Sequence, residues 1–384
     1  QEEALDFLSD FFEVEESVLL GDYQNTVDSI EALVDGNSSI CPICDLGLTT
    51  NMPFSAKLSA PYRMDLAITY RCNLDCAHCY NARPRNHPEL PTDQWKIIID
   101  KLWEIGIPHV VFTGGEPTLR DDLPELIAYA DQKGMVTGIN TNGTRLGDQA
   151  FLDKLIEAGL DHVQITLESH DPTIHNAMVR RDFAWAKTIA GLRNVVKSNL
   201  YMMTNTTLLT NNYQELEATL DFLAAEKVPT LGLNALIYSG KGKTVQTGLR
   251  EEELPGLLEL AIQKTEKNHQ RLIWYTPTQY CHFDPLMLDL GIKGCTAAYY
   301  NMCIEPDGNV IPCQSYYEPV GNMFTNQWEE IWNHQLCLSL RNRLDIPEEC
   351  KYCDFLQECG GGCPLARDHQ QPEPIYRDLL IIRS

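Results

Sequence analysis

Short apolar runs and longer amphipathic stretches alternate along residues 66–238. An apolar run of about five residues is typical of a buried strand, and an apolar residue every three or four positions is typical of a helix with one buried face. The expected strands are 66–70, 109–113, 135–141, 162–167, 201–209 and 230–238. The expected helices between them are 93–105, with Thr92 as its cap, 122–133, 148–158, 183–198 and 212–226.

This alternation predicts parallel strands that helices cover on both faces. Six such units make an α/β fold, a partial (β/α)6 TIM-like barrel with its active site at the carboxyl ends of the strands. After residue 277 the alternation stops, and turns and cysteines follow, so we expect a small cysteine-rich domain cross-linked by metal. The expected parts are 1–60, 61–276 and 277–384, with a helix over 327–341 that buries Cys337.

Composition excludes several classes of protein. The 384 residues carry a formal net charge of −24, which disfavours binding to nucleic acid or to an anionic membrane. No apolar run is long enough to span a bilayer, and the acidic start differs from a secretory leader, so we expect a cytoplasmic protein. Residues 1–56 contain no Lys or Arg. We interpret them as a solvated acidic segment with two short helices, the alternative being a docking site for a basic partner.

The fourteen cysteines are unevenly spread, with none between Cys79 and Cys281. Cys72, Cys76 and Cys79 follow the first strand with CxxxCxxC spacing. A closed zinc site uses four ligands, usually in CxxC pairs, whereas three thiolates on one loop leave one metal position open. The loop therefore favours an iron–sulfur cube with one accessible iron over a zinc or purely structural site.

The second strand ends in Gly114, Gly115, Glu116 and Pro117. Paired glycines let a ligand approach a strand end closely, and a carboxylate can receive an ammonium group. Alone, this sequence would be an ordinary turn. Beside an open iron it indicates a site for the amine of an amino acid that chelates that iron.

With these two motifs at successive strand ends, residues 64–240 resemble the radical S-adenosylmethionine (SAM) superfamily. The resemblance implies that Cys72, Cys76 and Cys79 hold a [4Fe–4S] cluster whose fourth iron binds S-adenosyl-L-methionine. It places His78 near adenine, although His78 could equally be a filler of the loop. Further candidates for cofactor binding are the strand-end residues Asn140, Thr166, Glu168 and Asn205. We interpret Thr141 and Thr207 as strand packing.

Residues 277–384 resemble the SPASM domain, which holds two auxiliary iron–sulfur clusters. The resemblance assigns Cys295, Cys313 and Cys363 to one cluster and Cys350, Cys353 and Cys359 to the other. The family's final downstream cysteine is missing.

Two further ligands are therefore needed. Cys281 is our candidate for the first cluster, because a two-residue turn at Asp307-Gly308 would pair Cys303 with Pro312 and turn it away from Cys313. For the second cluster we consider Cys41 or Cys44. They lie about twenty residues before the first strand, and an extended chain of that length could carry a thiolate to the second domain. The alternatives are a core CxxC, Asp368 or His369 as ligand, and an open iron.

These resemblances imply an enzyme that cleaves SAM reductively and abstracts hydrogen from a peptide or protein, as in thioether, carbon–carbon or epimerised products. The alternatives are a tetrapyrrole or redox-cofactor enzyme and, less favoured, a non-catalytic iron–sulfur electron carrier. The expected partners are the peptide or protein substrate and a flavodoxin- or ferredoxin-type electron donor. The proposed catalytic aspartate of anaerobic sulfatase-maturing relatives is Gln314 here, which disfavours formylglycine synthesis.

Overall fold

The computed structural model describes residues 57–367 and, before them, only positions 9, 14, 15, 17–21, 23, 24 and 27. The chain divides into two compact units, Gln1–Lys57 and Leu58–Ser384, and the architecture below is that of the second. Cys41, Cys44, Asp368 and His369 lie outside the described residues. In the part of the chain that the structure describes, no helix is long and apolar enough to cross a membrane.

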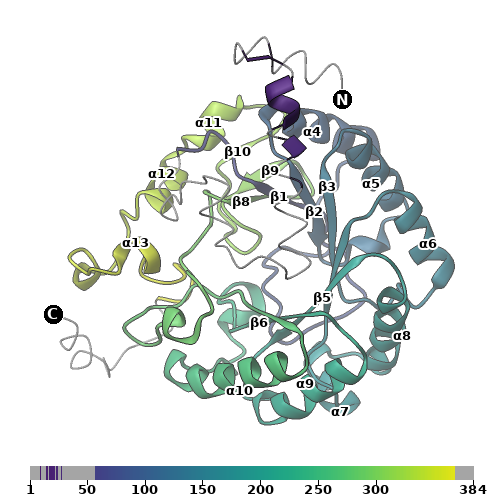
Figure 1. Ribbon diagram of the computed structural model, residues 1–384, viewed down its shortest axis with the longest axis vertical. Coiled ribbons are helices and arrows are strands. Elements are labelled where there is room, and N and C mark those ends of the chain that lie inside the picture. The colour runs from purple at the N-terminus through teal and green to yellow at the C-terminus, as the bar shows by residue number, and fades with distance from the viewer. Residues whose placement is uncertain are drawn as a thin grey trace. The chain divides into compact units, whose positions relative to one another are not determined.

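A single curved sheet forms the centre of the second unit (Figure 1). Its strands are β1 (Arg63–Thr69), β2 (His109–Gly114), β3 (Val136–Thr141), β4 (His162–Thr166), β5 (Tyr201–Thr207), β6 (Thr230–Asn234), β7 (Arg271–Trp274), β8 (Asn301–Ile304), β9 (Asn309–Ile311) and β10 (Gly321–Asn322). Their order is β10-β9-β8-β1-β2-β3-β4-β5-β6-β7. Strands β1 to β7 are parallel, β8 adds to β1 in parallel, and β9 and β10 are antiparallel additions.

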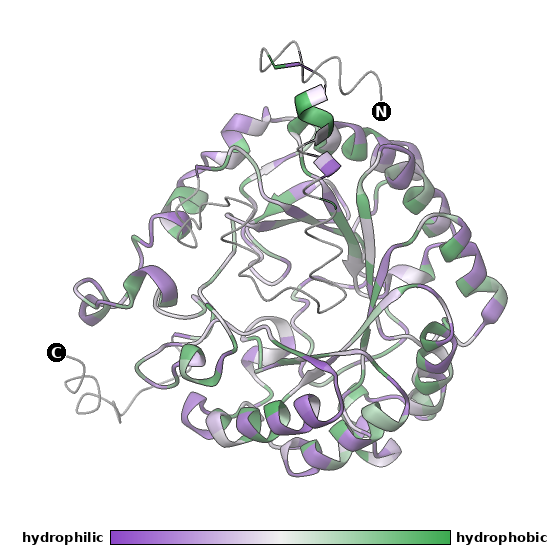
Figure 2. Cartoon of the chain, in the orientation of Figure 1, coloured by the Kyte–Doolittle hydropathy of each residue, from purple (hydrophilic) through white to green (hydrophobic). Residues whose placement is uncertain are grey.

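Helices surround this sheet and connect its strands (Figure 1). They are α4 (Thr92–Ile105), α5 (Leu123–Gln132), α6 (Gln149–Glu157), α7 (Pro172–Val179), α8 (Ala184–Val196), α9 (Leu216–Ala225), α10 (Leu254–Lys267), α11 (Trp328–Trp332), α12 (Gln335–Arg341) and α13 (Leu356–Cys359). Short 3₁₀ turns are η1 (Pro117–Leu119), η2 (Tyr213–Glu215), η3 (Gly240–Lys243), η4 (Glu251–Glu253), η5 (Pro285–Leu288) and η6 (Glu348–Cys350). Figure 2 shows that the outer helices carry both hydrophilic and hydrophobic residues, as expected of helices with one buried face.

Side-chain alternation along β1 separates two apolar clusters. Met64, Leu66 and Ile68 belong to the main core between the sheet and the helices. Ala67, on the opposite face of the strand, packs in a smaller cluster that includes Cys303. The C-terminal hairpin therefore shares the sheet with the barrel and contributes to its inner face.

The predicted fold class is confirmed, and the predicted strands and helices agree with β1 to β6 and with α4, α5, α6, α8 and α9. Helices α7 and α10 and strand β7 were not predicted from the sequence. The expected helix 327–341 is wrong in one respect, because it breaks into α11 and α12, and the side chain of His334 caps the second of these helices. Thr92 is the first residue of α4 rather than its cap, and its hydroxyl donates to Asp122 instead.

The expected hairpin register is also wrong. Cys303 pairs with Ile311 rather than Pro312, and Ile304 pairs with Val310. The loop has three residues because Gly308, with φ of 87°, adopts the left-handed conformation that closes such a hairpin. Cys303 is nevertheless fully buried, as is Cys337, in agreement with the prediction that both are buried thiols.

Candidate functional site

The three thiols of the CxxxCxxC motif lie on the loop after β1, and several backbone contacts hold that loop. The Arg85 guanidinium donates to the carbonyl oxygen of Cys72 at 2.8 Å. The amide of Asp75 donates to the carbonyl of Val179, at the end of α7, at 3.0 Å. The amide of Lys241 donates to the carbonyl of Cys79 at 2.9 Å. The loop is therefore fixed from both sides of the barrel mouth.

The thiols of this loop influence one another electrostatically. Burial raises the pKa of Cys72 to about 11, with the charges of Glu116 and Cys79 adding to the effect. Burial also raises the pKa of Cys76, and the charges of Cys79, Glu168 and Cys72 raise it further. Three half-buried thiols this close would lose their protons on binding a metal cluster, which makes the loop a suitable donor set for iron and sulfide.

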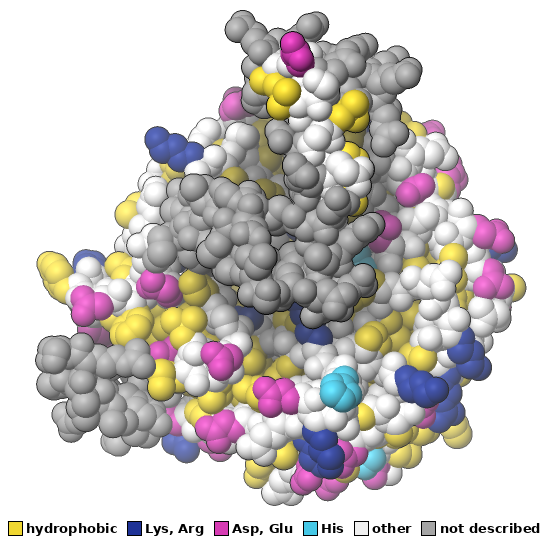
Figure 3. Space-filling model, viewed as in Figure 1, with side chains coloured by type: hydrophobic (Ala, Val, Ile, Leu, Met, Phe, Trp, Pro, Cys, Tyr) yellow, Lys and Arg dark blue, Asp and Glu magenta, His cyan; other side chains and the backbone are white. Residues whose placement is uncertain are grey.

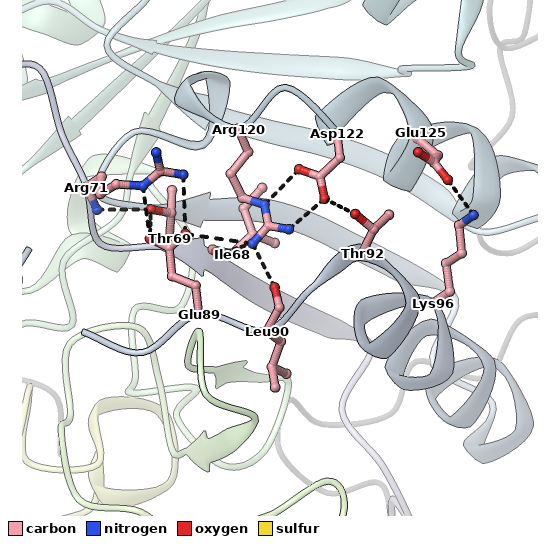
Figure 4. A network of polar contacts seen from close by, with 10 residues as sticks. All are labelled: Ile68, Thr69, Arg71, Glu89, Leu90, Thr92, Lys96, Arg120, Asp122 and Glu125. Atoms are coloured by element: carbon pink, nitrogen blue, oxygen red, sulfur yellow. Dashed lines mark hydrogen bonds and ion pairs between the residues drawn. The ribbon is translucent and has the colours of Figure 1, made fainter. Parts of the chain in front are cut away.

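The end of β1, where the thiol loop begins, is held by the network drawn in Figure 4. Arg120 donates to the carbonyl oxygens of Ile68 at 3.1 Å and Leu90 at 3.0 Å. The same guanidinium forms an ion pair with Asp122 at 2.6 Å, and Asp122 also accepts from Thr92. A buried arginine with these partners ties β1 to α4 and α5.

Gly114 and Gly115 make room for the backbone of β1. A Cβ on Gly114 would lie 2.0 Å from the carbonyl oxygen of Thr69, and φ is 126° there. A Cβ on Gly115 would lie 2.3 Å from the carbonyl oxygen of Arg71. Both glycines are therefore required by the close approach of the two strand ends, and their contact with a ligand stays a prediction.

Glu116 is fully buried, and donors from this chain already hold its carboxylate. Oε1 accepts from the hydroxyls of Thr118 at 2.6 Å and Thr141 at 2.7 Å, and Oε2 accepts from the amide of Asn142 at 2.8 Å. Burial raises its pKa despite these donors. Thr141 is buried in β3, as expected of a packed strand residue, and its hydroxyl also orients this carboxylate. Pro117, the next residue, opens η1.

His78 and Glu168 bring the thiol loop to the end of β4. Nε2 of His78 lies 2.9 Å from Oε1 of Glu168, whose side chain is completely buried. Oε2 of Glu168 accepts from the amide of Thr207 at 3.0 Å. The backbone of Glu168 is held as well, since its amide donates to Nδ1 of His175 at 3.2 Å and its carbonyl accepts from Asn212 at 2.7 Å.

Several buried polar atoms near these strand ends have no partner in the described residues. They include Nδ1 of His78, Oδ1 of Asn205, Nε2 of His175 and Oδ1 of Asn234. Asn205 pairs in register with Thr166, and Asn140, two strands away, is half-buried. A buried donor or acceptor without a partner favours a polar ligand at that place, as the nucleoside of a cofactor would be.

The C-terminal thiols form two groups. Burial raises the pKa of the Cys313 thiol, and the charges of Cys295 and Cys363 raise it further. Burial raises the pKa of Cys350 to about 11, with the charges of Cys359, Cys281 and Cys353 adding to the effect. The grouping of Cys295, Cys313 and Cys363, and that of Cys350, Cys353 and Cys359, are those that the sequence implied, whereas Cys281 lies with the second group. No three His, Cys, Asp or Glu side chains in the described residues are placed to hold a single metal ion.

Polar contacts join the C-terminal hairpin to the barrel mouth. The buried Glu305 accepts two hydrogen bonds from Arg83, at 2.6 and 2.7 Å, and one from the Tyr70 hydroxyl at 3.1 Å. The Tyr80 hydroxyl, one residue beyond Cys79, donates to Oε1 of Gln314 at 3.2 Å. The hairpin therefore reaches the thiol loop directly.

Two open cavities lie beside the thiol loop, and both carry cationic residues. One, of about 790 Å³, is lined by residues of α7 and by Arg180 and Arg181. The other, of about 410 Å³, is lined by Lys241 and Lys243 among others. Acidic side chains are spread over the visible face in Figure 3, in keeping with the net charge. Cations at the mouth of an acidic protein favour an anionic ligand there.

Several residues of the site were not identified from the sequence. Arg83 and Lys241 act through partners that are distant in the chain, and His175 acts through Glu168, seven residues before it. A signal was present for Lys241, because the Gly-Lys-Gly-Lys run of η3 directly follows the sixth predicted strand at its active end. The other two have no local signal.

Comparison with known proteins agrees with this geometry. The model of the "Radical SAM superfamily" matches residues 66–223, and that of the SPASM "Iron-sulfur cluster-binding domain" matches residues 295–354. An Fe-coproporphyrin III synthase of Methanosarcina barkeri is 30% identical over 77% of this chain and 81% of its own length. A PqqA peptide cyclase of Granulibacter bethesdensis is 28% identical over 80% of this chain and 83% of its own.

Solved structures show the same fold. SuiB of Streptococcus suis bound to S-adenosylmethionine is similar over 95% of this chain and 87% of its own, with a TM-score of 0.70 and 18% identity. SuiB bound to its precursor peptide SuiA is similar over 84% of this chain and 76% of its own, with a TM-score of 0.68 and 18% identity.

Proposed function

This chain belongs to the radical SAM superfamily, and from that membership we propose that it abstracts a hydrogen atom from a peptide or protein by means of a 5′-deoxyadenosyl radical. The observation that carries the proposal is the loop of Cys72, Cys76 and Cys79, whose thiols lie close to one another beside the buried pair of His78 and Glu168. S-adenosylmethionine, bound to a reduced [4Fe–4S] cluster, supplies the radical chemistry.

The residues of this chain hold and orient the cofactor in this proposal. Cys72, Cys76 and Cys79 are the cluster ligands, which leaves one iron for the cofactor. His78, kept in place by Glu168, and Asn205 offer polar atoms that lack partners within the described residues. The proposed role of Glu116 is to keep the end of β2 directed at the amine of the cofactor. The hydroxyls of Thr118 and Thr141 orient the Glu116 carboxylate.

A peptide or protein substrate is supported by three relatives. One is named for the cyclisation of the peptide PqqA, and SuiB is solved with its precursor peptide. The third, a protein named anSMEcpe that is 18–19% identical to this chain, is solved with bound peptides. Gln314 argues against formylglycine chemistry that needs a carboxylate base there, because its side-chain amide, which accepts a hydrogen bond from Tyr80, cannot take up a proton near neutral pH.

A tetrapyrrole substrate is the second candidate. The relative at 30% identity is an Fe-coproporphyrin III synthase, and Arg180, Arg181 and Lys243, which line the two cavities, offer cations to the carboxylates of such a ring system. Both proposals need a one-electron reductant. We expect a flavodoxin- or ferredoxin-type protein of the cytoplasm, a reducing compartment in which the free thiols of the described cysteines would persist.

Hydrogen transfer from substrate tests the proposal and separates the two candidates. The anaerobic, reconstituted enzyme is given SAM, a reductant and either a deuterated candidate peptide or a deuterated tetrapyrrole carboxylate. Deuterium in the 5′-deoxyadenosine, together with a mass change in the peptide, is the expected result. Deuterium transfer from the tetrapyrrole alone would assign the second function, and transfer from neither would reject both substrates.

A further inference from the structure

The segment that contains Cys281 packs against the C-terminal thiol region rather than against Cys295. The amide of Tyr280 donates to Sγ of Cys359 at 3.4 Å, and the thiol of Cys359 donates to the carbonyl of Thr278 at 3.6 Å. The Gln279 side chain donates to the carbonyl of Gly361 at 3.4 Å. Three consecutive residues before Cys281 therefore contact the chain around Cys359.

Close packing at the glycine run fixes this contact. A Cβ on Gly362 would lie 2.8 Å from Cγ of Gln279, so only glycine permits the approach. Gly360, Gly361 and Gly362 all have positive φ, at 64°, 74° and 72°. This left-handed turn separates Cys359 from Cys363. Cys359 therefore lies in the group of Cys350 and Cys353, whereas Cys363 lies in the group of Cys295 and Cys313.

A buried ion pair holds the Cys281 segment from the other side. Nδ1 of His282 lies 2.9 Å from Oε2 of Glu251, and both side chains are almost fully buried. The same carboxylate oxygen accepts from the amide of Gln279 at 3.2 Å. The backbone on either side of Cys281 is thus anchored to η4 and cannot easily swing toward Cys295.

We propose that Cys281 is the fourth thiolate of the auxiliary cluster held by Cys350, Cys353 and Cys359. The proposal differs from the expectation from sequence, in which Cys281 completes the first cluster and the N-terminal Cys41 or Cys44 completes the second. The proposal rests on the family's auxiliary clusters and not on the identity of the substrate.

Iron and sulfide counts of single and double variants test the assignment. Cys281→Ala and Cys350→Ala should each lose one cluster, about four irons, or retain it in a degraded form with less iron. The double variant, Cys281→Ala with Cys350→Ala, should lose no more iron than whichever single variant loses more. Cys281→Ala combined with Cys363→Ala should lose the sum of its two single losses. The proposal would be overturned if the iron losses were additive for Cys281→Ala with Cys350→Ala but not for Cys281→Ala with Cys363→Ala.

Matched controls keep the result interpretable. Cys337→Ala, which removes a buried thiol outside both groups, should keep the full iron content. If Cys281→Ala does not fold, Cys281→Ser should alter the same auxiliary electron paramagnetic resonance signal as Cys353→Ser. An unchanged signal in Cys281→Ser, or loss of that cluster in Cys41→Ala or Cys44→Ala alone, would reject the assignment. Retention of the signal from the Cys72, Cys76 and Cys79 cluster separates this result from failure of the proposed function.

Discussion

Nε2 of His78 lies 2.9 Å from Oε1 of Glu168, which joins the thiol loop after β1 to the end of β4. Glu168→Ala would leave both the His78 ring and the amide of Thr207 without their acceptor in a buried site. A loss of about 1–3 kcal/mol is expected from unpaired buried groups, which corresponds to a weakening of SAM binding by about 5-fold to about 150-fold.

Calorimetric titration of the reconstituted enzyme with SAM measures this loss, and the iron content should not change. Glu226→Ala removes a carboxylate that pairs with the exposed Arg193, so it serves as the control with unchanged affinity. Wild-type affinity in Glu168→Ala would show that the His78–Glu168 contact does not shape the cofactor site.

Gly114→Ala should displace the end of β1. The new Cβ would meet the carbonyl oxygen of Thr69, and the backbone conformation is one that alanine rarely adopts. We expect a lower midpoint of thermal unfolding and less iron bound by the thiol loop. Gly256→Ala, at a position of α10 where nothing lies within 4 Å of the new Cβ, should match the wild type in both measurements. Equal behaviour of the two variants would contradict this account of the strand end.

Glu305→Ala should strongly destabilise the junction of the hairpin and the barrel. It leaves Arg83 and the Tyr70 hydroxyl without their shared carboxylate. Breaking a buried ion pair costs about 3–5 kcal/mol, and since Arg83 is partly exposed we expect the lower end of that range. Denaturant titration of the holoenzyme measures the free energy of unfolding. Glu125→Ala breaks the exposed pair with Lys96 and should cost less than about 1 kcal/mol. A cost this small for Glu305→Ala would mean that the junction is not held by this carboxylate.

Stability should fall as the pH is lowered, through the buried His175. Burial lowers the pKa of His175 from 6.5 to about 4, so the unfolded chain binds a proton between these values that the folded chain does not. The free energy of unfolding therefore decreases as the pH falls below 6.5, and His175 contributes a loss of about 1.4 kcal/mol between about pH 7.5 and 5.5.

The variant His175→Asn keeps a side-chain oxygen for the amide of Glu168 and removes the titration. Its unfolding midpoint should depend less on pH than that of the wild type over the same interval. The exposed His269→Asn should retain the wild-type dependence. Identical pH profiles for His175→Asn and the wild type would show that His175 does not titrate in this way.

Local patterns predicted most of the barrel. Strand and helix periodicity, and the spacing of Cys72, Cys76 and Cys79 on one loop, depend on residues that are near in sequence. The hairpin register failed because one left-handed residue, Gly308, added a third loop position and shifted every pair.

Long-range placement could not be predicted in the same way. The parallel addition of β8 to β1 and the contact of Tyr280 with Cys359 join segments far apart in the chain. Chain order alone placed Cys281 beside the nearest motif position, Cys295, whereas packing at the glycine run placed it beside Cys359. The role of Glu168 was predicted from its strand end, but its support by His175 depended on α7, which had no distinct pattern.

Reductive cleavage of SAM is the decisive test of the thiol loop as the site of radical formation. The anaerobically reconstituted protein is reduced in the presence of SAM, and 5′-deoxyadenosine is quantified by chromatography for the wild type, Cys76→Ala and the control Cys337→Ala. We predict 5′-deoxyadenosine from the wild type and from Cys337→Ala, and none above background from Cys76→Ala. Equal yields from the wild type and Cys76→Ala would contradict the assignment of the thiol loop as the site of radical formation.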